Sequence, residues 1–203
     1  ALDNAGDFGK EIYVKAYSEY QKMLRHNNAM DFDDLIMNTV MLFKSDASVL
    51  NHYQDLYRYI MVDEYQDTNT AQFELIRLLA SKYRNLCVVG DDDQSIYRFR
   101  GANIYNILDF EKTFHDAKVI KLEQNYRSTQ TILNTANDVI ANNSERKIKS
   151  LWTDAEEGSR IHFRQLDTAS GEAVYIADDI RNKVQSGEAH YSDFAVLMRT
   201  NVQ

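Results

Sequence analysis

The feature that most constrains the fold is an apolar run that ends in two adjacent acids, within residues 59–69. Residues 59–62 are apolar without alternation, which predicts a strand buried on both faces, as in the parallel sheet of an α/β protein. Asp63 and Glu64 then stand at the carboxyl end of the strand, the edge of an open α/β sheet where ligands bind. Two acids there suit Mg²⁺ binding and activation of a water for attack on a phosphate. An acidic strand-to-helix turn is the simpler explanation of a bare Asp-Glu pair.

Composition sets the broad class of protein. With 203 residues, 44% of them hydrophobic and 27% charged, the chain is typical of a soluble globular protein with room for two small domains. No apolar run approaches the roughly 18 residues that a membrane span needs, and no amino-terminal signal pattern is visible. We therefore expect a cytoplasmic protein without a membrane partner. Cys87 lies in the apolar run 86–89, which predicts a structural core thiol in a reducing compartment.

The charge pattern bears on a nucleic-acid partner. A net charge of −8 argues against one, because phosphate binding is driven by clustered Lys and Arg. Between Arg98 and Lys149, however, nine basic residues stand against six acidic ones, while both flanks are acidic. The middle of the chain is locally positive, so net charge does not decide this question.

Three helices are predicted around the central strand. Residues 12–25 show helical spacing, and we expect their apolar stripe to pack in the core. Residues 30–34 cap a second helix, and a polar connection then leads to the strand. Asn69 and Gln72 resemble a capping box at the start of a third helix over residues 70–83. The expected buried positions of the second helix are Leu35, Ile36, Thr39, Val40 and Phe43.

A second informative stretch follows the predicted strand 86–89. Residues 90–101 run from a glycine through three acids and Gln94 into alternating aromatic and basic residues. This composition suits a loop that reads phosphate at one end and stacks unpaired bases at the other. A surface loop whose aromatic side chains tuck under a neighbouring helix fits it equally well.

The last third of the chain predicts a second parallel sheet. A strand at residues 118–122 precedes Arg127 and a helix, and Arg127 could meet an anion or form a solvated ion pair. Residues 161–166 alternate as a strand, residues 173–184 have helical period, and residues 194–198 form an apolar strand. This β-α-β pattern is typical of a parallel sheet.

Three blocks together carry a resemblance to a known family. They are VDEYQDTN (62–69), VGDDDQSIYRFRGA (89–102) and LEQNYRS (122–128). In sequence and order they resemble motifs II, III and IV of superfamily 1 DNA helicases of the UvrD/PcrA/Rep group. The resemblance implies an α/β fold with parts of two RecA-like, P-loop NTPase parallel-sheet domains and an N-terminal helical segment. Residues 1–25 would be the tail of an inserted helical domain, 26–117 the carboxyl half of the first RecA-like domain, and 118–203 the start of the second.

The resemblance also implies the nucleotide site, with ATP and Mg²⁺ as cofactors. Asp63 would hold Mg²⁺ through water, and Glu64 would activate the hydrolytic water. Gln94 would sense the γ-phosphate, Tyr126 would stack on adenine, and Arg127 would stabilise transition-state charge.

A DNA site is implied as well. Tyr97 and Phe99 would stack on bases of single-stranded DNA, and Arg100 would belong to the same DNA-contacting loop and tie it to the nucleotide. Asn201 would lie in a DNA-contacting turn of the second domain. Family members usually have Trp where Phe99 stands, and the smaller ring should stack less strongly.

The chain departs from the family in a second respect. It contains no G-x-x-x-x-G-K-[ST] phosphate loop. We therefore expect an internal piece of an ATP-dependent DNA helicase that acts in repair or replication, with the piece alone inactive. Expected partners are single-stranded DNA, duplex junctions, the remainder of the helicase chain, and repair or transcription proteins. The alternatives are a helicase-nuclease subunit of recombination repair and an ATP-independent module that binds single strands or partners.

Overall fold

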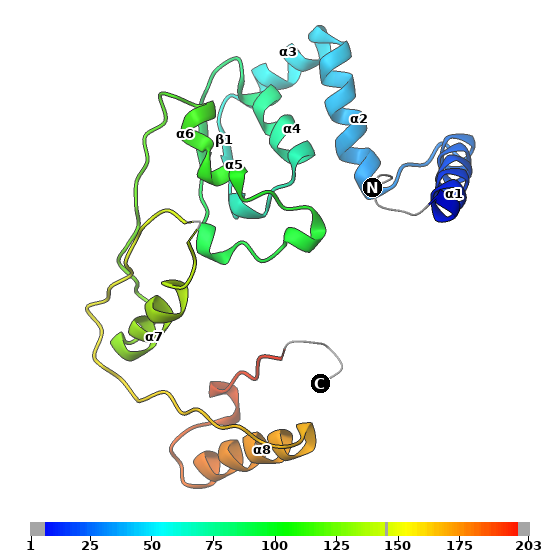
Figure 1. Cartoon of the computed structure of the whole chain (residues 1–203). Helices are drawn as coiled ribbons and strands as arrows, with labels where there is room; N and C mark the ends of the chain where they lie inside the picture. The colour runs from blue at the N-terminus through cyan, green and yellow to red at the C-terminus, as the bar shows by residue number, and fades with distance from the viewer. Residues whose placement is uncertain (1–6, 145, 199–203) are drawn as a thin grey trace. The chain divides into compact units, whose positions relative to one another are not determined.

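The computed structural model describes residues 7–144 and 146–198, so the proposed DNA contact Asn201 lies outside the described residues. The chain separates into two compact units (Figure 1). Unit 1 combines Ala1–Asn125 with Ala136–Trp152, and unit 2 combines Tyr126–Thr135 with Thr153–Gln203. Within the described parts, no helix is both long and apolar enough to cross a membrane.

Unit 1 contains a small parallel sheet. Strand β1 (Ile60–Val62) pairs with β2 (Leu86–Val88), and helix α4 (Thr70–Ala80) connects them. The predicted capping box is confirmed, because Asn69 Oδ1 accepts from Gln72 N at 2.9 Å and Gln72 Oε1 accepts from Asn69 N at 2.9 Å. A β-α-β unit of this kind brings the carboxyl ends of both strands to one edge.

The predicted burial of both strand faces is wrong. Met61 is 83% exposed, and Cys87, which pairs with it across the sheet, is also exposed. Side chains alternate along a strand, so Met61 and Cys87 share a face that the described residues leave open. The prediction of a core thiol at Cys87 is therefore wrong as well.

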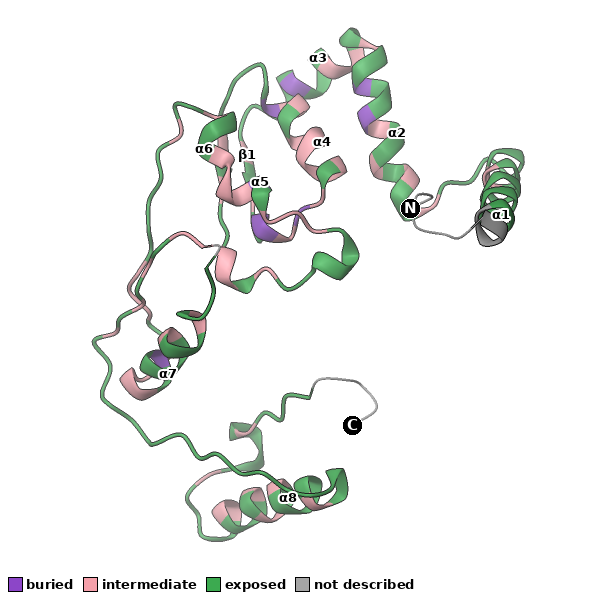
Figure 2. Cartoon of the chain, viewed as in Figure 1, coloured by how far each residue is buried: buried purple, intermediate pink, exposed green. Residues whose placement is uncertain are grey.

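Helices α2 (Phe32–Ser45), α3 (Ala47–Leu56) and α4 pack against one another and form the helical layer of unit 1. The cap predicted within residues 30–34 is confirmed, with Asp31 capping α2 in a capping box with Asp34. Val40 and Phe43 are each only 5% exposed. Figure 2 shows buried stretches of α2 in purple. Leu35, expected on the buried side of α2, is 50% exposed. At 3.6 residues per turn it lies about 140° around the helix from the buried Val40.

Helix α3 replaces the polar connection that we expected before β1. Asp46 caps it by accepting hydrogen bonds from the backbone of Ser48 at 2.8 Å and Val49 at 3.1 Å. Gln54 on α3 is 4% exposed and donates to Leu78 O at 2.8 Å. A polar sequence did not prevent this segment from packing as a helix, because the buried Gln54 side chain is satisfied by hydrogen bonds.

Helix α1 (Asp7–His26) forms over the predicted range, but its stripe is not core. Tyr13 and Tyr17 are 66% and 62% exposed. A helical stripe is buried only where another element packs on it, and the helix–helix packing of unit 1 is concentrated on α2, α3 and α4. Tyr20 links α1 to the start of α2 by donating to Asp31 Oδ2 at 3.0 Å.

Short elements complete unit 1 beside the sheet. Tyr65 is fully buried and meets Phe110 edge-to-face at 5.7 Å, while Asn106 donates to Thr68 O at 3.0 Å. These contacts fasten the turn after β1. The elements are η2 (Tyr65–Asp67), η3 (Asp92–Gln94), η4 (Arg98–Arg100), α5 (Tyr105–Leu108) and α6 (Phe110–Thr113).

The later part of the chain contains α7 (Gln130–Ile140), α8 (Ala169–Gln185) and η5 (Tyr191–Asp193). The first half of α7 belongs to unit 2 and the second half to unit 1. Helix α8 confirms the helix predicted over residues 173–184, with Thr168 as its cap accepting from Gly171 N at 3.0 Å.

The strands predicted for the second sheet are wrong in the described structure. Residues 118–122, 161–166 and 194–198 are not assigned as strands, and Leu122 and Leu197 are 79% and 95% exposed. A strand exists only when a neighbour supplies hydrogen bonds for its backbone. Outside β1 and β2, the described chain has one isolated bridge, Gln124 with Trp152. The pattern of these segments fits a strand, but no ladder forms.

Candidate nucleotide and DNA site

The two proposed catalytic carboxylates lie together at the end of β1. Asp63 and Glu64 are both exposed, and the Glu64 amide donates to Asp63 Oδ1 at 2.9 Å. Glu64 has a left-handed backbone, with φ of 48° and ψ of 41°. A non-glycine residue in this region costs about 1–3 kcal/mol, and such strain concentrates at functional sites. Tyr65 holds the turn, since its amide donates to Val89 O at 3.0 Å.

Gln66 is a residue that the sequence reasoning missed. It is 1% exposed, its Nε2 donates to Glu64 Oε2 at 2.8 Å, and its Oε1 accepts from Asp91 N at 3.0 Å. A Cβ at Gly90 would lie 2.6 Å from Gln66 Oε1, so glycine makes room for this bond. Gln66 thus joins the end of β1 to the loop after β2.

The loop after β2 continues this chain of bonds to Gln94. Asp91 Oδ2 accepts from Gln94 Nε2 at 2.8 Å, and Asp91 Oδ1 accepts from Asp93 N at 3.0 Å. Gln94 is exposed. We name Glu64, Gln66, Asp91 and Gln94 the polar relay, because consecutive members are hydrogen bonded. The relay connects the proposed general base with the proposed phosphate sensor.

Asp67 adds a further carboxylate next to the relay. Gln66 Nε2 lies 3.5 Å from Asp67 Oδ2, and Asp67 Oδ1 is buried without a partner among the described residues. Burial raises the pKa of Asp67, and the nearby Glu64 carboxylate raises it further. The Asp67 carboxyl therefore binds a proton more readily than an ordinary aspartate.

The described residues fit Mg²⁺ bound through water better than a metal bound only by protein. They contain no group of three His, Cys, Asp or Glu side chains that could enclose an ion. Mg²⁺ commonly keeps several waters and takes one or two carboxylates plus substrate phosphates. The exposed Asp63 carboxylate at the strand edge suits that coordination.

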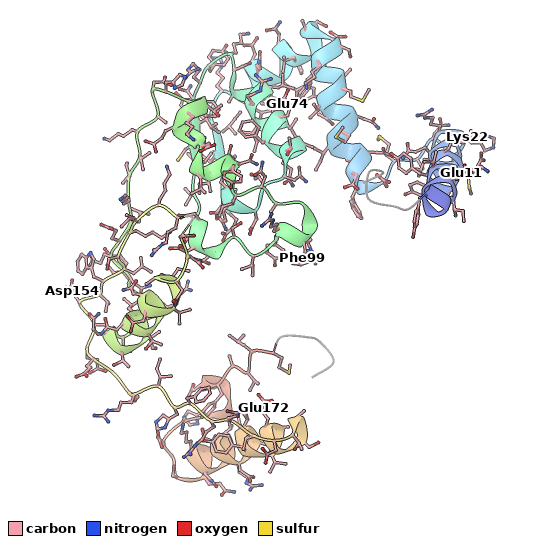
Figure 3. All side chains as sticks on the ribbon, in the orientation of Figure 1. Glu11, Lys22, Glu74, Phe99, Asp154 and Glu172 are labelled. Carbon is pink, nitrogen blue, oxygen red and sulfur yellow. The ribbon has the colours of Figure 1, made fainter. Side chains whose placement is uncertain are left out.

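The aromatic side chains of the loop after β2, Tyr97 and Phe99, are exposed to solvent. Phe99 is 79% exposed, and Figure 3 shows it on the loop that carries η4. The rings of Tyr97 and Phe99 are 5.9 Å apart, and the Arg100 guanidinium lies 5.3 Å and 5.5 Å from their centroids. Phe99 is thus not tucked under a helix, and Arg100 stacks on the aromatic pair.

Tyr126 and Arg127 belong to unit 2, whereas the polar relay belongs to unit 1. The structure therefore assigns these two residues and Glu64 to different units. Both residues are exposed, Tyr126 to 85%. Their roles at the nucleotide remain predictions.

Comparison with known proteins identifies the family. Residues 3–115 match the UvrD/REP helicase N-terminal domain, and residues 120–203 match the UvrD-like helicase C-terminal domain. Over its whole length, the chain is 53% identical to the ATP-dependent DNA helicase PcrA of Staphylococcus aureus (strain Mu50) and 52% identical to PcrA of Staphylococcus epidermidis. It spans 28% of the length of these relatives. The chain therefore belongs to the UvrD-like helicases, which confirms both the resemblance read from its motifs and the α/β, RecA-like fold class.

Proposed function

We propose that this chain is part of a longer ATP-dependent DNA helicase that couples Mg-ATP hydrolysis to movement on single-stranded DNA and duplex unwinding. The relatives that it matches are named ATP-dependent DNA helicases, and it spans 28% of their length. A phosphate loop supplied by the rest of such a protein would hold the β- and γ-phosphates. We further propose a cytoplasmic protein that acts on single strands and duplex junctions in repair or replication.

The observation that carries the proposal is the polar relay. Glu64 would accept a proton from the attacking water, while Asp63 would bind Mg²⁺ through water. Bound Mg²⁺ would supply charge neutralisation at the phosphates. Gln66 fixes the Glu64 carboxylate with a bond of 2.8 Å, so that the base has a defined orientation at the strand edge.

The loop from Gln94 to Arg100 would couple the state of the bound nucleotide to DNA binding. Gln94 lies at the start of this loop. Its side chain would donate to the γ-phosphate in place of the hydrogen bond that it now donates to Asp91. Tyr97 and Phe99 follow within five residues and would stack on bases. Loss of the γ-phosphate would return Gln94 to Asp91 and shift the aromatic pair. Tyr126 would stack on adenine, and Arg127 would stabilise charge in the transition state.

The test is a Glu64→Gln substitution in the full-length protein that contains this chain. We expect DNA-stimulated ATP hydrolysis to be abolished, because the base is lost, and ATP affinity to be retained, because Asp63 remains. Steady-state hydrolysis and equilibrium binding of a fluorescent ATP analogue measure the two quantities. An equal loss of rate and affinity would contradict these roles. The 203-residue chain alone should show no hydrolysis above background.

A further inference from the structure

A short basic segment in unit 1 contacts the acidic part of the loop after β2. We call Arg146, Lys147 and Lys149 the basic clamp. They follow α7 in the sequence region that matches the C-terminal family domain. The acids that they contact, Asp91–Asp93, lie in the region that matches the N-terminal family domain. None of the roles assigned above uses the clamp.

Lys149 is the centre of the clamp because its ammonium reaches all three acids. Its Nζ donates to Asp91 Oδ1 in a short hydrogen bond and lies 3.0 Å from Asp92 Oδ1 and 3.3 Å from Asp93 Oδ2. The Lys149 side chain is 16% exposed, and those of the three acids are between 7% and 28% exposed. Partial burial strengthens such pairs relative to surface pairs.

The other two clamp residues reinforce the contact. Arg146 Nη2 lies 2.7 Å from Asp93 Oδ2, and Lys147 N donates to Asp92 Oδ2 at 2.8 Å. The Lys147 ammonium turns away and pairs with Glu111 at 2.7 Å. Two cations, Arg146 and Lys149, therefore face three carboxylates. Loss of either would leave a strongly negative, half-buried loop.

The ionisation of the pair agrees with this geometry. Burial tends to lower the pKa of Lys149, but hydrogen bonds to Asp91 and Asp92 outweigh burial and raise it. Burial likewise tends to raise the pKa of Asp91, but hydrogen bonds from Lys149 and Gln94 hold it below its ordinary value. Both groups are charged at neutral pH.

We propose that Lys149 is a positioning residue that fixes the Asp91 carboxylate and, through it, the Gln94 side chain. Asp91 accepts from Lys149 on one oxygen and from Gln94 on the other, so its placement depends on both. The clamp thereby makes the loop's response to nucleotide depend on the segment after α7. This inference rests on the proposed function, in which Gln94 meets the γ-phosphate.

The experiment uses the full-length protein with Lys149→Ala, Lys149→Gln and Lys149→Arg. Lys82→Ala is the matched control, because Lys82 also forms an ion pair in unit 1, at 2.6 Å with Asp55 in the helical layer. The measurements are kcat and KM for DNA-stimulated ATP hydrolysis, single-strand affinity with and without a non-hydrolysable ATP analogue, and the melting temperature.

We expect Lys149→Ala and Lys149→Gln to lower kcat about tenfold, which corresponds to about 1.4 kcal/mol. KM for ATP should change much less, and the response of DNA affinity to the analogue should be reduced. Lys149→Arg should restore most of the kcat and most of the response of DNA affinity to the analogue. Lys82→Ala should match the wild type in every readout except melting temperature. If Lys149→Ala does not fold, Lys149→Gln decides, because it removes the charge but keeps a polar side chain that can donate hydrogen bonds.

Two other outcomes have separate meanings. An active wild type whose Lys149→Gln variant keeps a normal kcat and a normal response to the analogue would overturn the positioning role. A wild type without DNA-stimulated hydrolysis would overturn the proposed function itself. A failure of the inference can thus be distinguished from a failure of the function on which it rests.

Discussion

The helical layer and the polar relay are both in unit 1, but different forces hold them. In the layer, Val40 and Phe43 are each 5% exposed, and the Phe43 ring meets Tyr53 at 5.6 Å. In the relay, the 1% exposed Gln66 contributes hydrogen bonds to Glu64 and Asp91. Apolar burial tolerates small shifts, because it is roughly proportional to area, whereas hydrogen bonds weaken steeply with angle.

This difference separates stability from function. Changes in the helical layer should lower the free energy of unfolding and leave the chemistry of the folded protein intact. Changes in the polar relay should disturb the chemistry by more than their effect on stability. The following predictions test that separation, from the largest expected effect to the smallest.

Phe43→Ala should lower the free energy of unfolding by about 3–5 kcal/mol, because it removes a buried ring and leaves a cavity. Urea unfolding of the 203-residue chain measures the loss. Phe32→Ala is the control, since Phe32 on the same helix is 89% exposed. Equal stability of the two variants would mean that the helical layer is not the core of unit 1.

Gln66→Leu should cost about 1–3 kcal/mol of unfolding free energy, because it removes the amide that pairs Glu64 and the Asp91 backbone. The matched control is Gln54→Leu, another buried glutamine, which donates to Leu78 O and Ser81 Oγ in the helical layer. Both variants should lose similar stability, but only Gln66→Leu should lower the kcat of ATP hydrolysis in the full-length protein. Similar kcat values for the two variants would contradict the separation between the polar relay and the helical layer.

Phe99→Ala should weaken single-strand binding by about tenfold or somewhat more, because base stacking is worth about 1–3 kcal/mol per base. The loss should be similar for all DNA sequences, and the salt dependence should barely change, since no phosphate contact is removed. Fluorescence anisotropy with the full-length protein measures it. Phe163→Ala is the control, as Phe163 is 85% exposed in unit 2. If Phe99→Ala binds like the wild type, the exposed ring has no DNA role.

Glu74→Gln tests the electrostatics of the helical layer. Hydrogen bonds from Arg77 and then Lys44 lower the pKa of Glu74 from 4.5 to about 2. A lowered carboxyl pKa contributes stability that is present above about pH 4.5 and is lost as the pH falls toward about 2. Arg77 and Lys44 are 44% and 54% exposed, so solvent screening reduces the expected contribution to about 1 kcal/mol.

Urea unfolding between pH 7 and pH 2.5 should therefore show a difference between the wild type and Glu74→Gln that shrinks with acid. Glu172→Gln on the exposed surface of α8 is the control. A difference that is constant with pH would mean that the ion pairs do not account for the stability.

The sequence predicted local features better than long-range ones. The capping residues Asp31 and Asn69 act within three or four residues and were found from spacing alone. The predicted strand 161–166 failed because a strand needs a partner, and nothing in its own residues specifies one. Gln66 was missed for a similar reason, since its partner Asp91 lies 25 residues away. The available signal was a glutamine placed between Glu64 and Asp67, directly after the predicted strand.

The central claim is that the loop from Gln94 to Arg100 couples nucleotide to DNA, and Gln94→Ala tests it most directly. The measurement is the single-strand affinity of the full-length protein with and without a non-hydrolysable ATP analogue. We predict that the variant binds DNA like the wild type without nucleotide, because Tyr97 and Phe99 are intact, and that the analogue no longer changes its affinity. A variant that responds to the analogue as fully as the wild type would contradict the claim.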